Sequence, residues 1–236
     1  AGLSLKVDAG EIAALMGRNG MGKTTLLRAI MGLVKPTRGS IRFEGLELTG
    51  LDERSLAPVR RRVAMLFQGG ALFDSMTVFE NVAFPLREKL RLKGDIVTRR
   101  VEEKLEQVGL KGIGHKFPAE LSGGMRKRAG LARALVMEPE IILFDEPTTG
   151  LDPLMAKAIH DLIVAMQQQF KFTAVMVSHE IPEIFGISDY VAMLKNGRIA
   201  EMAPSNEFVK TTDEEIREFI FVAGTVTPKG LPTASL

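Results

Sequence analysis

Short apolar runs alternate with longer amphipathic stretches along most of the chain. The runs have the length of buried strands, and we expect strands at residues 3–7, 12–16, 40–43, 63–67, 141–144, 174–178 and 190–194. The stretches between them have helical spacing, and we expect helices at residues 23–33, 52–62, 96–108, 123–137, 153–170 and 213–220. Strands that alternate with helices favour a mostly parallel sheet covered on both faces, so the predicted fold class is α/β.

The stretch at residues 153–170 has a strong helical pattern. Its residues Leu154, Ala158, Leu162 and Met166 recur every four positions, which predicts that they lie on one face of a helix. Pro153 suits the first turn, where its missing N–H costs no hydrogen bond.

Two regions depart from the alternating pattern. Residues 69–139 are mostly helical, which indicates a helical unit inserted into the α/β core. Residues 224–236 are rich in Thr, Pro and Gly, and we expect them to be loose. The chain opens at Ala1, without Met and already inside a strand pattern, so we expect that N-terminal residues are missing.

Composition narrows the class of protein without identifying it. The chain has 236 residues, of which 45% are hydrophobic and 25% charged, as in an ordinary globular protein. Its formal net charge of +2 gives no general reason to expect nucleic acid or an anionic membrane as a partner. The absence of cysteine excludes disulfides and thiolate metal sites. No apolar run approaches the ~20 residues that a membrane-spanning helix needs.

A glycine-rich segment joins the strand at residues 12–16 to the following helix. It fits the phosphate-loop pattern G-x-x-x-x-G-K-[ST] and consists of Gly17, Arg18, Asn19, Gly20, Met21, Gly22, Lys23 and Thr24. Glycines let consecutive N–H groups point at phosphate oxygens, and the helix N-terminus adds roughly half a positive charge. Lys23 supplies a full charge for the β- and γ-phosphates, and the Thr24 hydroxyl can ligate Mg²⁺. We assign Thr25 to the same site. A structural turn with an incidental lysine is the alternative.

A second strand ends in two acids. The apolar residues 141–144 lead into Asp145 and Glu146, and ligands in a parallel α/β sheet bind at the C-terminal ends of the strands. With the phosphate loop upstream, we expect Asp145 to hold the Mg²⁺ shell. Glu146 can then face the γ-phosphate and polarise a water molecule.

Many protein families share these two motifs, and residues 121–125 indicate which of those families the chain resembles. Leu121, Ser122, Gly123, Gly124 and Met125 resemble the LSGGQ signature of the ABC ATPase family. A serine followed by glycines also opens a helix well and exposes N–H groups to a phosphate. The resemblance implies a P-loop NTPase with a RecA-like core and an inserted helical signature subdomain. The implied units are residues 1–68 and 140–222 for the ATP-binding core, residues 69–139 for the helical subdomain and residues 223–236 for a tail.

Further positions match the family in the correct order. Gln68 resembles the Q-loop glutamine, which senses Mg²⁺ and the attacking water. Asp152 closes a segment at residues 149–152 that resembles the D-loop, and His179 resembles the switch histidine that contacts the γ-phosphate. The implied catalytic residues are therefore Glu146, His179 and Gln68, and the implied metal ligands are Thr24, Gln68 and Asp145. Residues 17–25, 122–125 and Asp152 are expected to contact ATP.

Some residues fall outside the motifs or depart from them. Met125 replaces the usual signature glutamine. No aromatic residue between Ala1 and Gly17 can stack on adenine, so the adenine contact has no candidate. We expect His115 and His160 at the surface. Arg126, Lys127 and Arg128 are expected to form a solvated face.

Two segments indicate which ABC system the chain resembles. Residues 67–88 and 121–135 look like the ATPase subunits of MCE (mammalian cell entry) lipid transport systems, which carry Met at the position of Met125. This resemblance implies a homodimer at the cytoplasmic face of the inner membrane, with an integral permease and a periplasmic MCE lipid-binding subunit as partners. The implied cargo is phospholipid or another hydrophobic molecule, and no nucleic acid is expected. Residues 17–33 instead look like the ATPases of branched-chain amino-acid importers, which stay an alternative. A non-transport ABC protein of DNA repair or translation is a further alternative.

A group of apolar side chains follows Gln68. In ABC ATPases this region forms the groove for a coupling helix of the permease, a helix-in-groove contact. We expect about half of these residues in the groove and half in the core of the helical subdomain. The residues are Leu72, Phe73, Met76, Val78, Phe79 and Phe84.

Overall fold

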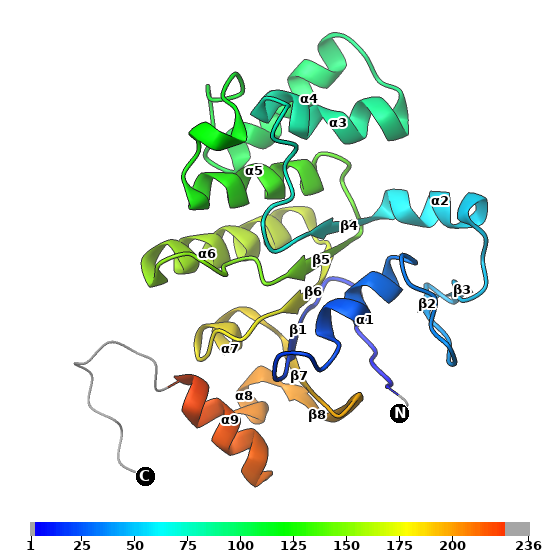
Figure 1. Cartoon of the computed structure of the whole chain (residues 1–236), viewed down its shortest axis with the longest axis vertical. Helices are drawn as coiled ribbons and strands as arrows, with labels where there is room; N and C mark the ends of the chain where they lie inside the picture. The colour runs from blue at the N-terminus through cyan, green and yellow to red at the C-terminus, as the bar shows by residue number, and fades with distance from the viewer. Residues whose placement is uncertain (1–2, 225–236) are drawn as a thin grey trace.

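A six-stranded sheet forms the centre of the computed structural model, which describes residues 3–224 (Figure 1). Its strand order is β4-β5-β6-β1-β7-β8, and all neighbouring strands are parallel except β7 and β8. The strands are β1 (Ile12–Met16), β4 (Val63–Leu66), β5 (Ile141–Asp145), β6 (Thr173–Val177), β7 (Tyr190–Lys195) and β8 (Arg198–Pro204). A two-stranded hairpin of β2 (Arg42–Phe43) and β3 (Leu46–Glu47) lies apart from it.

Alternate residues of each central strand enter two separate cores, because successive side chains of a strand point to opposite faces. Ile12, Ala14 and Met16 of β1 belong to the larger core, whereas Leu15 belongs to the smaller one. The helices α1 (Lys23–Ile30) and α2 (Glu53–Arg62) cover the smaller core, and α6 (Pro153–Phe170) covers the larger. The α/β class with both faces covered is confirmed.

The larger core continues into a helical unit at the top of Figure 1. It contains α3 (Val78–Leu90), α4 (Asp95–Gln107), a 3-10 turn (Pro118–Glu120) and α5 (Gly123–Leu135). Thr77 and Glu80 form a capping box at the start of α3. Asn81, which is fully buried, accepts from the N–H of Phe73 and donates to the carbonyls of Phe73, Met76 and Thr77. The segment after Gln68 is thus fixed to α3.

The C-terminal part adds elements that the hydrophobic pattern did not predict. These are α7 (Glu183–Ile187), β8 and α8 (Ser205–Phe208); the predicted last helix, α9 (Glu214–Gly224), follows them. Helix α9 extends beyond the predicted end at residue 220, and the rest of the predicted loose tail lies outside the described residues. No helix within residues 3–224 is long and apolar enough to cross a bilayer.

Several predicted elements are shorter or absent. Residues 3–7 form no strand, because their alternating Leu3, Leu5 and Val7 pack against the smaller core without pairing to a neighbouring strand. The strand expected at residues 40–43 is reduced to Arg42–Phe43. Helix α1 ends at Ile30 rather than residue 33, because Gly32 adopts a φ of 68° and the Leu33 N–H donates back to the Arg28 carbonyl.

The buried face of α6 coincides only in part with the apolar residues spaced by four. Leu154 is 78% exposed, whereas Ile159, Ile163 and Met166 are buried in the larger core. Residues four apart advance by about 40° more than one turn, so a set with strict four-residue spacing drifts around the helix. The buried face follows mixed spacing of three and four, and it includes His160.

Candidate nucleotide site

The phosphate loop joins β1 to α1 at the C-terminal edge of the sheet. Gly17 has a φ of 150°, and a Cβ atom there would lie 2.5 Å from the carbonyl oxygen of Leu194 on β7. Only glycine fits between the loop and this neighbouring strand. Gly22 precedes α1 in a left-handed conformation and no side chain caps the helix. The first-turn N–H groups of Lys23, Thr24 and Thr25 are therefore suited to an anion.

Lys23 is the cation of this loop. It is 6% exposed, and its ammonium donates to the carbonyls of Gly17 at 2.6 Å and Arg18 at 3.1 Å. Burial lowers the pKa of Lys23, and the nearby carboxylates of Glu146 and Asp145 oppose that shift. The ammonium therefore lies inside the loop, close to two carboxylates and without a direct ion pair in the described chain.

Thr24 and Asp145 form a pair of oxygen donors. The Thr24 hydroxyl donates to Asp145 Oδ1 at 2.9 Å, and Asp145 is buried at the end of β5. Mg²⁺ prefers oxygen ligands and usually completes its shell with phosphate oxygens and water. The two side chains fit such an ion, since they bring a hydroxyl and a carboxylate together beside the phosphate loop.

Glu146 connects three other segments. Its backbone has a φ of 50°, which is uncommon for a residue other than glycine. Its carboxylate accepts from Gln68 Nε2 at 3.2 Å and from the Thr149 hydroxyl at 3.0 Å. His179 Nδ1 lies 3.5 Å from the other carboxylate oxygen. The three predicted catalytic residues, Glu146, Gln68 and His179, therefore meet at one point.

The signature residues lie elsewhere. The Ser122 hydroxyl accepts from the Met125 N–H at 3.3 Å and caps α5. Gly123 and Gly124 face Leu151 and Met155, which flank the start of α6 and its N-cap residue Asp152. Within residues 3–224, no hydrogen bond or ion pair joins residues 122–125 to residues 17–25. One chain does not bring these two predicted nucleotide contacts together.

Two surface predictions are wrong. Lys127 is buried and donates to the Gln68 carbonyl, while Arg126 and Arg128 donate to the carbonyls of Leu121 and Val108. These cations satisfy carbonyls at loop ends instead of forming a solvated face. The other error concerns His160, which is 2% exposed because the true buried face of α6 includes it.

His160 belongs to a buried cluster that sequence reasoning missed. The Thr148 hydroxyl donates to Glu180 Oε2 at 2.7 Å, and His160 Nε2 lies 3.5 Å from that hydroxyl and 3.6 Å from the same carboxylate oxygen. Thr148 follows Glu146 and Glu180 follows His179, so the cluster ties the loops after β5 and β6 to α6. Burial lowers the pKa of His160, which favours the neutral ring.

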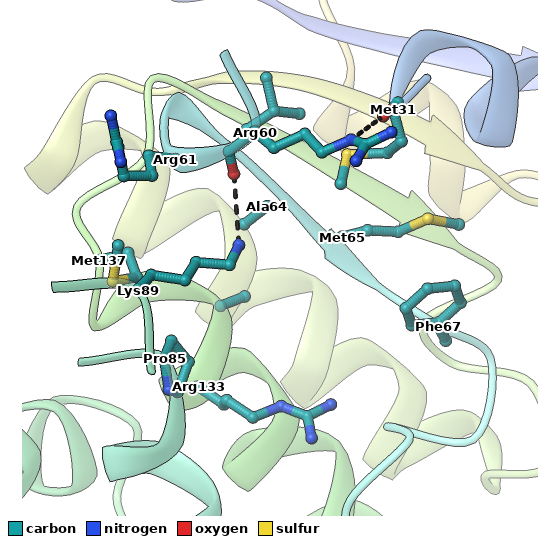
Figure 2. Close-up of a pocket in the computed structure, with 12 residues that line it drawn as sticks. Met31, Arg60, Arg61, Ala64, Met65, Phe67, Pro85, Lys89, Arg133 and Met137 are labelled. Atoms are coloured by element: carbon teal, nitrogen blue, oxygen red, sulfur yellow. Dashed lines mark hydrogen bonds between the residues drawn. The ribbon is translucent and has the colours of Figure 1, made fainter. Parts of the chain in front are cut away.

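A separate hollow lies beside β4, away from the phosphate loop (Figure 2). Its volume is about 190 Å³. In Figure 2 Met65 and Phe67 project from β4 and its end, while Lys89 reaches toward the carbonyl of Arg60. Arg61 and Lys89 have no acidic partner among residues 3–224. Both apolar and cationic groups therefore line this hollow.

Comparisons with known proteins agree with this geometry. The sequence model of the ABC transporter family matches residues 1–149. The chain is 43% identical over 218 residues to the intermembrane phospholipid transport system ATP-binding protein MlaF of Escherichia coli K12, covering 92% of this chain and 81% of that protein. MlaF of Haemophilus influenzae is 41% identical, with 92% and 83% covered. A dimeric post-hydrolysis structure of the ATP-binding cassette MJ0796 bound to ADP and phosphate is 32% identical, with a TM-score of 0.79 and 86% and 89% covered.

The buried His160 makes stability depend on pH. Its pKa is lower in the folded chain than the ordinary 6.5, so the unfolded chain binds more protons and the free energy of unfolding falls as pH drops below about 6.5. Urea unfolding at about pH 7.5 and pH 5.5 should show a smaller pH-dependent loss for His160→Gln than for the parent. The exposed His115 provides the matched control, and His115→Gln should keep the parental loss. An equal loss in His160→Gln and the parent would contradict this assignment.

Proposed function

The chain belongs to the ABC transporter family as an ABC-type ATPase, and from that premise we propose that it hydrolyses Mg-ATP between two copies of itself to power phospholipid transport through a membrane complex. The meeting of Gln68, Thr149 and His179 on the carboxylate of Glu146 carries the proposal. This carboxylate directly follows Asp145, whose oxygen is bonded to Thr24 of the phosphate loop. Glu146, the proposed base, is therefore adjacent in sequence to the residue expected to hold Mg²⁺ beside the triphosphate.

Each residue of the proposed site has a separate role in ATP hydrolysis. The phosphate-loop amides and Lys23 bind the triphosphate, and Glu146 orients a water molecule or accepts its proton. Gln68 holds Glu146 in place, and His179 contacts the γ-phosphate. Mg²⁺, held by Thr24 and Asp145 with Gln68 nearby, would offset charge on the β- and γ-phosphates.

The second copy supplies the missing side of the site. Within residues 3–224, residues 122–125 form no hydrogen bond or ion pair with the phosphate loop of their own chain, yet the N-terminus of α5, which they open, suits a phosphate. A head-to-tail dimer would place Ser122 to Gly124 of each copy against the ATP of the other, with Asp152 near the same boundary. Because neither copy encloses ATP alone, ATP binding would close the dimer and hydrolysis would open it.

The hollow beside β4 is a docking surface for a permease helix at the membrane. Met65, Phe67 and the cationic Lys89 line it, and the half-exposed Phe73 lies on the loop that follows β4. Of the six apolar residues predicted to divide between groove and core, Val78 is core and the other five are partly or substantially exposed, and none of the six lines this hollow. An amphipathic helix with an acidic side chain would complement both the apolar and the cationic groups.

The cargo and remaining partners follow from the relatives. The MlaF proteins are named as components of an intermembrane phospholipid transport system. By the same relationship, this chain would act peripherally at the cytoplasmic face of the inner membrane, with a periplasmic MCE subunit. A branched-chain amino-acid importer is the second candidate, favoured by residues 17–33 alone.

Glu146→Gln should separate ATP binding from hydrolysis. The amide keeps the shape but cannot accept the proton of water, so steady-state hydrolysis should fall by at least about 100-fold. Light scattering should then detect a persistent dimer in Mg-ATP. Glu88→Gln, at an exposed position of α3, is the matched control and should hydrolyse ATP normally. Parental turnover by Glu146→Gln would rule out the role given to this carboxylate.

Lys23→Ala should act on nucleotide affinity instead. Loss of charge-assisted bonds worth about 1.5–3 kcal/mol weakens ATP binding on the order of 10- to 100-fold. Titration with a fluorescent ATP analogue measures this change. Lys35→Ala, exposed in the turn after α1, should bind as the parent does. Equal affinities of Lys23→Ala and Lys35→Ala would remove Lys23 from the site.

Lys89→Glu should weaken recovery of the permease from detergent-solubilised membranes. Reversal of charge in the hollow opposes an acidic docking helix, and we expect a loss on the order of tenfold. Lys93→Glu, exposed just beyond α3, is the control. Mass spectrometry of the recovered complex also identifies cargo: bound phospholipid with an MCE subunit fits the proposal, amino-acid-importer subunits fit the second candidate, and nucleic acid or ribosomes contradict both.

A further inference from the structure

Two cations of α5 hold the loop that carries Gln68. Arg133 donates to the carbonyl of Ala71 at 2.8 Å and to that of Gly70 at 2.9 Å. Lys127, nearly two turns earlier on the same helix, donates to the carbonyl of Gln68. Three of four consecutive carbonyls in this loop are therefore bonded to one helix.

The helix and the loop also touch through their backbones. A Cβ atom on Gly130 would lie 2.8 Å from Leu66 Cδ1 and 3.2 Å from Gly70 Cα. Gly130 lies between Lys127 and Arg133 along α5, so one cation lies on each side of the contact between Gly130 and the loop. With no side chain between them, the loop has little room to slide along the helix.

Neither cation forms an ion pair within residues 3–224, although the carboxylates of Glu180 and Glu146 are near enough to Lys127 to oppose the lowering of its pKa. Burial lowers the pKa of both Lys127 and Arg133. Buried cations are costly unless their donors are satisfied. In this chain the loop carbonyls accept the hydrogen bonds of both cations. Displacement of the loop would leave both cations without these acceptors, which would be energetically costly.

The same helix begins at the signature residues. Ser122 is the N-cap of α5, and Lys127 lies five residues beyond it. At the other end of the linkage, Gln68 Nε2 donates to Glu146 at 3.2 Å. A continuous set of contacts therefore runs from Ser122 through Lys127 to Gln68 and the proposed catalytic base.

We propose that Lys127 and Arg133 are positioning residues that make Gln68 move together with the signature end of α5. Given the dimeric ATPase proposed above, the partner's nucleotide at Ser122 would then set the position of Gln68 against Glu146. The two cations act on the rate of hydrolysis through Gln68, without contacting ATP.

A double-mutant cycle tests whether Lys127 acts through Gln68. Lys127→Met removes the charge at similar length, and misplacement of Gln68 should lower kcat on the order of tenfold while ATP affinity changes by less than about twofold. In a Gln68→Ala background, Lys127→Met should have little further effect on the residual rate, because the glutamine side chain that Lys127 positions is already absent. Lys127→Arg should restore most of the rate.

Arg128→Met is the matched control. Arg128 is the next cation of α5, but it donates at 3.1 Å to the carbonyl of Val108, inside the helical unit. We expect Arg128→Met to leave kcat nearly parental and to add independently to Gln68→Ala. Thermal unfolding of each variant measures its stability, and Arg133→Met with Arg133→Lys repeats the cycle if Lys127→Met does not fold.

The outcomes distinguish this inference from the proposed function. A parental kcat for Lys127→Met, or multiplicative losses in Lys127→Met and Gln68→Ala, would overturn the positioning role while ATP hydrolysis by the parent stands. Equal losses in Lys127→Met and Arg128→Met would also overturn it, since they would reflect stability alone. Absence of ATP hydrolysis by the parental chain with its membrane complex would instead refute the proposed function.

Discussion

Parallel pairing of β1, β6 and β5 is the constraint on which the site depends. It brings to one edge of the sheet three loops that are far apart in sequence. The registers pair Leu15 with Val177 and Asp145 with Val177, so β6 lies between the phosphate-loop strand and the acidic strand. The Glu146 N–H continues this ladder by donating to the Val177 carbonyl at 3.0 Å. The position of the proposed base is therefore set by backbone hydrogen bonds, whereas its carboxylate is oriented by side chains from other loops.

Local motifs allowed much of this edge to be predicted from sequence. The phosphate loop, the acids after β5 and the histidine after β6 each follow a buried strand, and parallel topology places such strand ends together. His160, Lys127 and Arg133 are different, since their importance depends on which face of a helix meets which loop. The four-residue apolar spacing in α6 departs from the buried face of that helix, and His160, which matches no motif, carries no local sign that it is buried. No local signal distinguishes Lys127 from the solvated lysines that most helices carry.

The edges of the fold were also hard to predict. The alternation of partly buried and exposed residues along β8 is weak. The strand is defined mainly by its antiparallel pairing with β7. Residues 3–7 show the opposite case, where alternation without a neighbouring strand gives no β-ladder. Hydrophobic spacing reports burial, while strand formation also requires a partner for the backbone.

The two surfaces proposed to bind nucleotide differ in their electrostatics. The start of α1 has no side-chain cap and lies next to buried Lys23, so it is prepared for negative charge. The start of α5 is capped by Ser122, and its cations Lys127 and Arg133 are bonded to loop carbonyls instead of pointing to solvent. The signature surface thus offers backbone N–H groups with little free charge and would bind a phosphate weakly by itself. In the proposed dimer it would bind once the phosphate loop of another copy has placed the triphosphate, which would make closure depend on ATP and reverse after hydrolysis.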